Sequence, residues 1–261
     1  MIKNGKKQLK SFIRNFQYMS DIHLEYRDGL FDIPIISKNL ILAGDIGNPF
    51  KTNYYDFLLS CSYKYEYTFV VLGNHEYWGS NMSKTHEQVN IIFSKFKNVF
   101  LLDNSIVETD NFVFMGCTLW SKILNEPLNI QGDEYNITID DKNITWNDLN
   151  RLHNEDVNWL TNALGMYNEK NIVVITHHVP TYKLVHPYYD IPKFKKYSDR
   201  FYTNLEHLIK PPVSTWICGH SHCNMNIEIN DVNLHINAIG YPSENEKKYL
   251  NDKLRIVKLK S

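Results

Sequence analysis

The sequence predicts an α/β fold, because short apolar runs alternate along the chain with longer polar segments that are compatible with helices. Its 261 residues are enough for one large domain with a sizeable core. Hydrophobic residues make up 43% and charged residues 22%, as is usual for a soluble globular protein. Neither an internal repeat nor a low-complexity linker divides the chain. We therefore predict a basic extension over residues 1–15 and a single domain over residues 16–261.

The apolar runs predict the strands of this domain. The run at 172–175 is continuously apolar, which is typical of a strand buried on both faces. Asn230-Asp231 separates two runs and predicts a hairpin. In chain order the predicted strands cover residues 16–19, 39–43, 68–72, 99–102, 112–115, 172–175, 215–218, 226–229, 232–236 and 254–259.

Polar segments between these strands predict four helices, over residues 53–65, 84–96, 148–164 and 199–209. The last of them should end before Pro211-Pro212. Residues 125–147 are polar and irregular, and we expect a long surface insertion there. A Pro- and Tyr-rich loop is expected at 187–192. Because long loops often shape binding sites, both segments are candidates for a substrate pocket.

Composition also restricts the partners and the compartment. The net charge of −1 provides no overall basic field to attract nucleic acid or an anionic membrane. No apolar stretch is long enough to span a membrane, and the basic N-terminus lacks the apolar segment of a secretory signal, so we expect it to be an exposed tail. Four scattered cysteines argue against a disulfide framework and favour a reducing, cytoplasmic location. Cys218 and Cys223 flank two histidines, but without a second close pair we interpret them as buried thiols.

Five predicted strands run directly into residues of metal-binding types. Because ligands of α/β proteins bind at the carboxyl ends of strands, these side chains should gather into one cluster. Each motif alone is weak evidence, since a lone histidine after a strand can be an ordinary core residue. Their joint occurrence predicts a metal site formed by Asp21, His23, Asp45, Asn74, His177, His220 and His222.

The ligand types restrict the metal. Imidazole and carboxylate groups without thiolates suit manganese, iron, zinc, nickel or cobalt and argue against a structural zinc cage. Seven ligands are too many for one tetrahedral ion, so we predict two divalent transition-metal ions with a shared carboxylate. Glycine precedes Asp45 and Asn74, which lets the chain turn close to the ions.

These residues resemble the five motif blocks of the calcineurin-like metallophosphoesterases. The blocks correspond to Asp21-x-His23, Gly44-Asp45, Gly73-Asn74-His75-Glu76, His177 and Gly219-His220-x-His222, and the resemblance runs over about residues 16–241. It is closest to uncharacterised bacterial-type members, which share Thr118-Leu119-Trp120 and Thr176-His177-His178-x-Pro180. The implied fold is a four-layer α/β/β/α sandwich of two mixed sheets flanked by helices, with the site at the C-terminal ends of the strands.

The resemblance also implies a role for each site residue. Asp21, His23 and His222 would hold one ion. Asn74, His177 and His220 would hold the other, and Asp45 would bridge the two. His75 would bind no metal and would face the leaving group.

From this site we predict hydrolysis of a phosphomonoester or phosphodiester. A hydroxide bridging the ions would attack phosphorus in line, and His75 would protonate the leaving alkoxide. Asn74 would bind metal through its amide oxygen and offer its NH₂ group to a phosphate oxygen. Glu76 and His178 are expected to support the ligands. The expected partner is a phosphorylated small molecule or a phosphodiester, while the oligomeric state stays open.

Three alternatives remain. A nuclease is disfavoured, because the chain has no Arg/Lys-rich stripe beyond its N-terminal tail. Phosphoprotein phosphatases carry a Gly-Asp-x-x-Asp-Arg-Gly block, whereas residues 44–50 read Gly-Asp-Ile-Gly-Asn-Pro-Phe and lack the second Asp and the Arg. A non-catalytic scaffold with this fold would be expected to have lost a ligand or the general acid, and all of these residues are present here.

Overall fold

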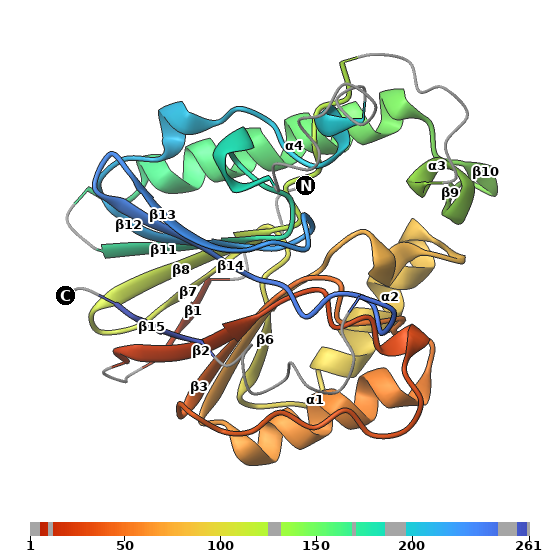
Figure 1. Cartoon of the computed structure of the whole chain (residues 1–261), viewed down its shortest axis with the longest axis horizontal. Helices are drawn as coiled ribbons and strands as arrows, with labels where there is room; N and C mark the ends of the chain where they lie inside the picture. Colours follow the sequence, from red (N-terminus) through yellow and green to blue (C-terminus); the bar gives the residue numbers. More distant parts are fainter. Residues whose placement is uncertain are drawn as a thin grey trace.

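Two stacked β-sheets lie between outer helices in the computed structural model of this chain (Figure 1). The structure describes residues 6–9, 13–124, 132–168, 171–185, 197–244 and 255–259, so the predicted loop at 187–192 lies outside the described residues. From top to bottom in Figure 1 the layers are α4, the seven-stranded sheet, the five-stranded sheet, and α1 with α2. The predicted four-layer α/β/β/α sandwich is therefore confirmed.

The five-stranded sheet holds the N-terminal half of the core. Its order is β15-β2-β3-β4-β6, and only β15 runs antiparallel to its neighbour. The four parallel strands therefore all end at the same edge. Their bounds are β2 Asn15–Met19, β3 Asn39–Ala43, β4 Tyr67–Val71, β6 Val99–Leu101 and β15 Ile256–Lys258.

The seven-stranded sheet has the order β1-β7-β8-β11-β12-β14-β13 and is mixed, with antiparallel pairs β7–β8 and β13–β14. The hairpin between β13 and β14 turns at Asn230 and Asp231, whose φ angles of 50° and 65° suit a tight two-residue turn. The bounds are β1 Lys6–Gln8, β7 Ser105–Glu108, β8 Phe112–Cys117, β11 Asn171–Thr176, β12 Val213–Cys218, β13 Asn224–Ile229 and β14 Val232–Asn237.

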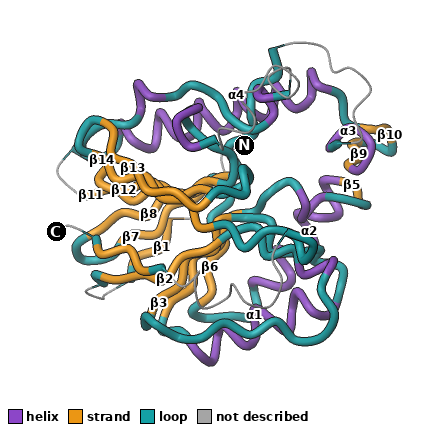
Figure 2. The backbone as a smooth tube through the Cα atoms, in the orientation of Figure 1, coloured by secondary structure: helices purple, strands orange, loops and turns teal. Residues whose placement is uncertain are grey.

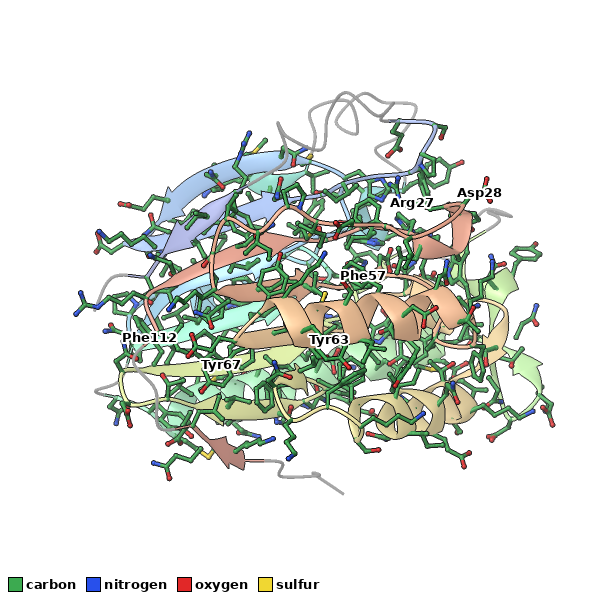
Figure 3. The ribbon with its side chains drawn as sticks, turned by 90° about the horizontal axis from the view of Figure 1, so that it is seen from below. Arg27, Asp28, Phe57, Tyr63, Tyr67 and Phe112 are labelled. Carbon is green, nitrogen blue, oxygen red and sulfur yellow. The ribbon has the colours of Figure 1, made fainter. Side chains whose placement is uncertain are left out.

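Each outer helix buries one face on a sheet. Figure 3 shows α1 (Thr52–Lys64) along the lower face, where it carries Phe57 and Tyr63. Phe57 is buried against the sheet, whereas Tyr63 is 82% exposed, as expected for opposite faces of an amphipathic helix. Below the same sheet lies α2 (Met82–Phe93). On the far side, α4 (Trp146–Gly165) begins with a capping box between Thr145 and Asp148.

Three apolar clusters separate the four layers. One lies between α1, α2 and the five-stranded sheet and includes Leu58 and Val89. A second joins the two sheets through Phe69 and Phe114, whose rings stack with centroids 4.6 Å apart. The third packs α4 on the seven-stranded sheet and contains Trp216. Among the described residues, no helix combines the length and apolar composition needed to cross a membrane.

Several elements differ from the sequence predictions. The N-terminal extension is exposed at Lys7 and Gln8, as expected, but Lys6–Gln8 also forms β1, which pairs in parallel with β7, a strand that the apolar pattern did not indicate. Part of the expected irregular insertion is ordered. It contains the short helix α3 (Asp133–Asn136), and its strands β9 (Ile137–Ile139) and β10 (Lys142–Asn143) form a small sheet with β5 (Ser80–Asn81), seen at the right of Figure 2.

The predicted helix at 199–209 is wrong. Its place is taken by two single 3₁₀ turns, Ser198–Arg200 and Glu206–Leu208. Polar side chains of this segment accept hydrogen bonds from backbone N–H groups elsewhere in the chain: Asp199 accepts from Leu124 at 2.8 Å and Thr203 from Lys122 at 2.7 Å. Such side chains compete with helical hydrogen bonding.

Candidate metal centre

The strands that precede the predicted ligands end at one edge of the sandwich, because β2, β3 and β4 run parallel in one sheet and β11 and β12 run parallel in the other. The loops after them are cross-linked through the backbone. The N–H of Asp21 donates to Gly44 O at 3.0 Å, and the N–H of Gly219 donates to His177 O at 2.9 Å. A β-bridge between Ser20 and Ala238 joins the two sheets at this edge.

Five of the seven predicted ligands have a left-handed backbone conformation. Residues other than glycine rarely adopt it, because Cβ then crowds the following carbonyl. The φ angles lie between 51° and 63° for Asp21, His23, Asp45, His220 and His222. Each of these residues follows a strand, so the left-handed turn ends the extended chain and redirects the side chain. Backbone strain of this kind clusters at functional sites.

Two glycines allow the loops to approach one another. Gly44 has φ of 85°, and a Cβ there would lie 2.4 Å from Nδ1 of His177. A Cβ on Gly73 would lie 2.1 Å from Oδ1 of Asp45. Neither position can carry a side chain while the neighbouring residue keeps its place.

A first group of side chains consists of Asp21, His23 and His222, whose ligand atoms all lie within 4.8 Å of one another. The Nε2 atoms of the two histidines are 3.1 Å apart, and Nε2 of His222 is 3.5 Å from Oδ1 of Asp21. The outer ring nitrogens face carboxylates: Nδ1 of His23 lies 3.1 Å from Glu25 Oε1, and Nδ1 of His222 lies 2.7 Å from Glu244 Oε2.

A second group consists of Asp45, His177 and His220, with Asn74 beside it. Nε2 of His177 lies 3.1 Å from both Nδ1 of His220 and Oδ1 of Asn74. The outer nitrogens face backbone carbonyls, Ala43 O at 2.9 Å from His177 Nδ1 and Arg200 O at 3.2 Å from His220 Nε2. A carbonyl only accepts hydrogen bonds, so the protons of both rings point outward.

Asp45 stands between the two groups. Its Oδ2 is 3.3 Å from Nε2 of His177 in one group and 3.9 Å from Nε2 of His23 in the other. Its Oδ1 accepts the backbone N–H of His75 at 2.8 Å, which fixes the carboxylate. One carboxylate therefore faces both clusters.

These donors fit divalent cations. In each group, the inner nitrogens of two histidines lie close to each other and to a carboxylate, while their outer nitrogens are held by hydrogen-bond acceptors. That outer support is the usual arrangement around metal-binding histidines. Two nitrogens 3.1 Å apart cannot both carry a proton between them, and a bound cation would accept a lone pair from each. The residues present thus suit two ions without thiolate ligands.

The charges of the site favour cations as well. Burial lowers the pKa of His177, but the Asp45 and Asp21 carboxylates outweigh it and raise that pKa to about 9. Burial and the neighbouring His178 and His177 hold the pKa of His220 well below its usual range. The carboxylates therefore create a negative field at the very point where the imidazole nitrogens converge.

Two further predicted residues support the ligands. Glu76 accepts the backbone N–H groups of Asp45 at 3.1 Å, Ile46 at 2.7 Å and Gly73 at 2.7 Å, so it ties two ligand loops together. His178 lies with its ring centroid 4.1 Å from that of His220. Burial, with the neighbouring His177, lowers the pKa of His178 to about 3, which keeps the imidazole neutral.

His75 lies next to the metal groups and is buried. Its Nδ1 is 3.0 Å from Glu25 Oε1 and its Nε2 is 3.1 Å from the Tyr241 hydroxyl. The ring stacks on Trp78 with centroids 3.7 Å apart. Glu25 thus contacts both His23 and His75, and these hydrogen bonds lower its pKa although burial alone would raise it.

A cavity of about 260 Å³ opens over the site. Its walls combine Asp45, Asn74, His220 and His222 with residues from irregular segments. Sequence motifs missed several of these, because they belong to no strand end: Trp78, Asp133, Arg200 and Glu244. The sequence pointed to these residues only through the long insertion at 125–147, which was expected to shape the pocket. Asp133 does belong to that insertion.

Asp133 also changes the expectation for Asn74. The Asn74 NH₂ group donates to Asp133 Oδ1 at 2.8 Å, and Trp78 Nε1 donates to the same oxygen at 2.8 Å. This orients the amide oxygen of Asn74 toward His177 and leaves one amide proton of the NH₂ group. All seven predicted ligands and His75 thus gather in one place, while their roles as ligands and acid stay predictions.

Comparison with known proteins agrees with this geometry. The model of the calcineurin-like phosphoesterase family matches residues 17–224. An uncharacterised protein of Acanthamoeba polyphaga mimivirus is 30% identical over 260 residues, which cover 89% of this chain and 93% of that protein. The solved structure of the phosphopantetheinyl hydrolase of Mycobacterium tuberculosis is similar in fold, with a TM-score of 0.71 and 16% identity, over 93% of this chain and 95% of that one. The chain therefore belongs to the calcineurin-like phosphoesterase family, and it is a metal-dependent hydrolase of phosphoric esters.

Proposed function

We propose that this enzyme hydrolyses phosphoesters of small molecules with two divalent ions and a histidine general acid. Asp21, His23 and His222 would hold one ion, Asn74, His177 and His220 the other, and Asp45 would serve both. The observation that carries the proposal is the pair of inward-facing imidazole nitrogens on each side of Asp45. The cavity of about 260 Å³ favours a small phosphoester as substrate.

Two cations bound there would neutralise phosphate charge and make hydroxide available at neutral pH. The protein holds their ligands in place before substrate arrives. Glu76 fixes the loops of Asp45 and Gly73, and Glu25 and Glu244 fix the imidazoles of His23 and His222. Because these groups are set in advance, little reorganisation is needed during the reaction.

The contacts of His75 support its proposed role as the acid that protonates the leaving group. Glu25 accepts the Nδ1 proton, which leaves the Nε2 proton facing the cavity, where the Tyr241 hydroxyl lies 3.1 Å away. Trp78 stacks on one face of the ring and prevents it from tilting. A positioned acid of this kind accelerates hydrolysis by roughly 10²–10⁴-fold.

Leaving-group dependence tests this role. In the presence of Mn²⁺, His75→Ala should lose roughly 10²–10⁴-fold in kcat on an alkyl phosphate, whose leaving group needs a proton. It should lose far less on p-nitrophenyl phosphate, whose leaving group departs as a stable anion. Metal content by elemental analysis should equal that of the wild type.

A matched control is His86→Ala, because His86 is a partly exposed histidine on α2 that pairs with Asp103 away from the metal groups. This variant should keep wild-type turnover of both substrates. If His75→Ala lost the same factor in kcat on both substrates, this result would argue against His75 as a general acid. Wild-type protein that hydrolyses neither substrate with any divalent transition metal would overturn the proposed function itself.

A further inference from the structure

Arg200 is the one lysine or arginine among the described residues that line the cavity. Its side chain is only 14% exposed. The other charged residues on the cavity wall are the acids Asp45, Asp133 and Glu244. A partly buried guanidinium on the wall of a phosphate-hydrolysing site is suited to bind phosphate.

The guanidinium is held rigidly. Glu134 accepts hydrogen bonds from both terminal nitrogens, at 2.9 Å from Nη1 and 2.6 Å from Nη2. This bidentate pair occupies two of the five N–H groups of an arginine and leaves three. Glu134 thus orients the guanidinium and still leaves it N–H groups that can donate hydrogen bonds to a ligand.

The backbone around Arg200 is tied to the metal centre. The Arg200 carbonyl accepts from the His220 ring at 3.2 Å, and the Phe201 ring packs on His220 with centroids 5.3 Å apart. On the other side, Asp199 accepts the N–H of Leu124 at 2.8 Å. The side chain is therefore fixed relative to the ligands of the second ion.

We propose that Arg200 binds a non-bridging oxygen of the substrate phosphate and makes the enzyme prefer phosphomonoesters to phosphodiesters. This inference rests on the proposed function. A phosphomonoester has three non-bridging oxygens. Two bound cations would neutralise charge on two of them, and the third would be available to Arg200. A diester has only two non-bridging oxygens and one negative charge, so it gains much less from the arginine.

The test compares Arg200→Ala and Arg200→Lys with the wild type on p-nitrophenyl phosphate and bis-p-nitrophenyl phosphate, with saturating Mn²⁺. Loss of a hydrogen bond to a charged group should lower kcat/KM for the monoester roughly 10- to 100-fold. The diester should change less than about threefold by the same reasoning. Arg200→Lys should fall between, because an ammonium keeps the charge but not the planar fork.

Inorganic phosphate gives a readout that does not need turnover. Its inhibition constant should rise in Arg200→Ala by about the same factor as the loss in monoester kcat/KM. The matched control is Arg151→Ala, which removes an exposed arginine that pairs with Glu155 on α4 and should leave all these values unchanged.

An equal loss on both esters, or an unchanged phosphate inhibition constant, would overturn the role of Arg200. Either result leaves the proposed function standing, because the wild type still hydrolyses an ester. Failure of the wild type to hydrolyse either ester with any metal would instead overturn the proposed function, and this inference with it.

Discussion

Single glycines decide how closely the loops that carry the predicted ligands can approach one another. A Cβ on Gly73 would lie 2.1 Å from Asp45 Oδ1, and the Gly73 N–H also donates to Glu76 at 2.7 Å. Gly73→Ala should therefore displace Asp45, remove at least one bound ion and abolish most activity. Elemental analysis and turnover of p-nitrophenyl phosphate measure both effects. Gly165→Ala is the control, since a Cβ at Gly165 meets nothing within 4 Å and should stabilise α4 by up to about 1 kcal/mol. Full metal content in Gly73→Ala would refute the expectation.

The clustering of the predicted ligands, with Glu76 beside them, could be predicted from sequence, whereas the other residues that hold them could not. Asp21, Asp45 and His177 each follow an apolar strand, and parallel strands bring their ends together in any α/β sheet. Glu25 and Arg200 act through contacts that depend on how irregular segments fold over the site. No periodicity marks such residues, so only three-dimensional structure brings them to the cavity.

Among the elements, α4 carries a buried carboxylate that should make folding depend on pH. Asp156 is 7% exposed and accepts the backbone N–H of Trp120 at 3.3 Å. Burial, with the nearby Asp103, raises the pKa of Asp156 to about 7. In the unfolded chain the group ionises near pH 4. Between these values the folded state binds more protons, so stability falls as the pH rises from about 4 to 7.

The variant Asp156→Asn should not lose stability as the pH rises in this way, because an amide does not ionise. Relative to wild type, the variant should gain on the order of 2–3 kcal/mol in free energy of unfolding between pH 5 and pH 8. Urea unfolding of both proteins in EDTA at the two pH values measures the difference. Glu155→Gln, at an exposed neighbouring position on the same helix, should show no such gain. An equal change in the free energy of unfolding between pH 5 and pH 8 for Asp156→Asn and wild type would contradict the argument.

Elements with a strong apolar pattern were predicted well, and elements defined by local polar contacts were not. The strand expected at 39–43 and the structure's β3 agree, because the run is apolar after Asn39 and buried along its whole length. The segment 199–209 carries a helix-like pattern, yet its Asp199 and Thr203 bond to backbone groups of residues 122–124. β1 is a short basic strand that depends on its partner β7, a long-range contact that composition does not report.

At the scale of the whole molecule, the metal centre joins the two halves of the sandwich. Asp21, His23, Asp45 and Asn74 follow strands of the five-stranded sheet, whereas His177, His220 and His222 follow strands of the seven-stranded sheet. Cations bound between them would hold the two sheets together at this edge. They would also offset the cost of the left-handed backbone at five of these residues, roughly 1–2 kcal/mol each.

Removal of metal should therefore lower the stability of the entire fold. A site occupied at 100 times its dissociation constant contributes about 2.7 kcal/mol. For a domain of this size that corresponds to a melting temperature roughly 5–10 °C lower in EDTA, regained on addition of excess Mn²⁺. Differential scanning calorimetry with parallel metal analysis measures the shift. Asp45→Asn should lose most of the response, because the residue that faces both clusters no longer carries a charge. Arg151→Ala should keep it in full. Equal melting temperatures for metal-free and metal-loaded wild type would show that the ligands are set by the fold alone, and that the ions contribute only to catalysis.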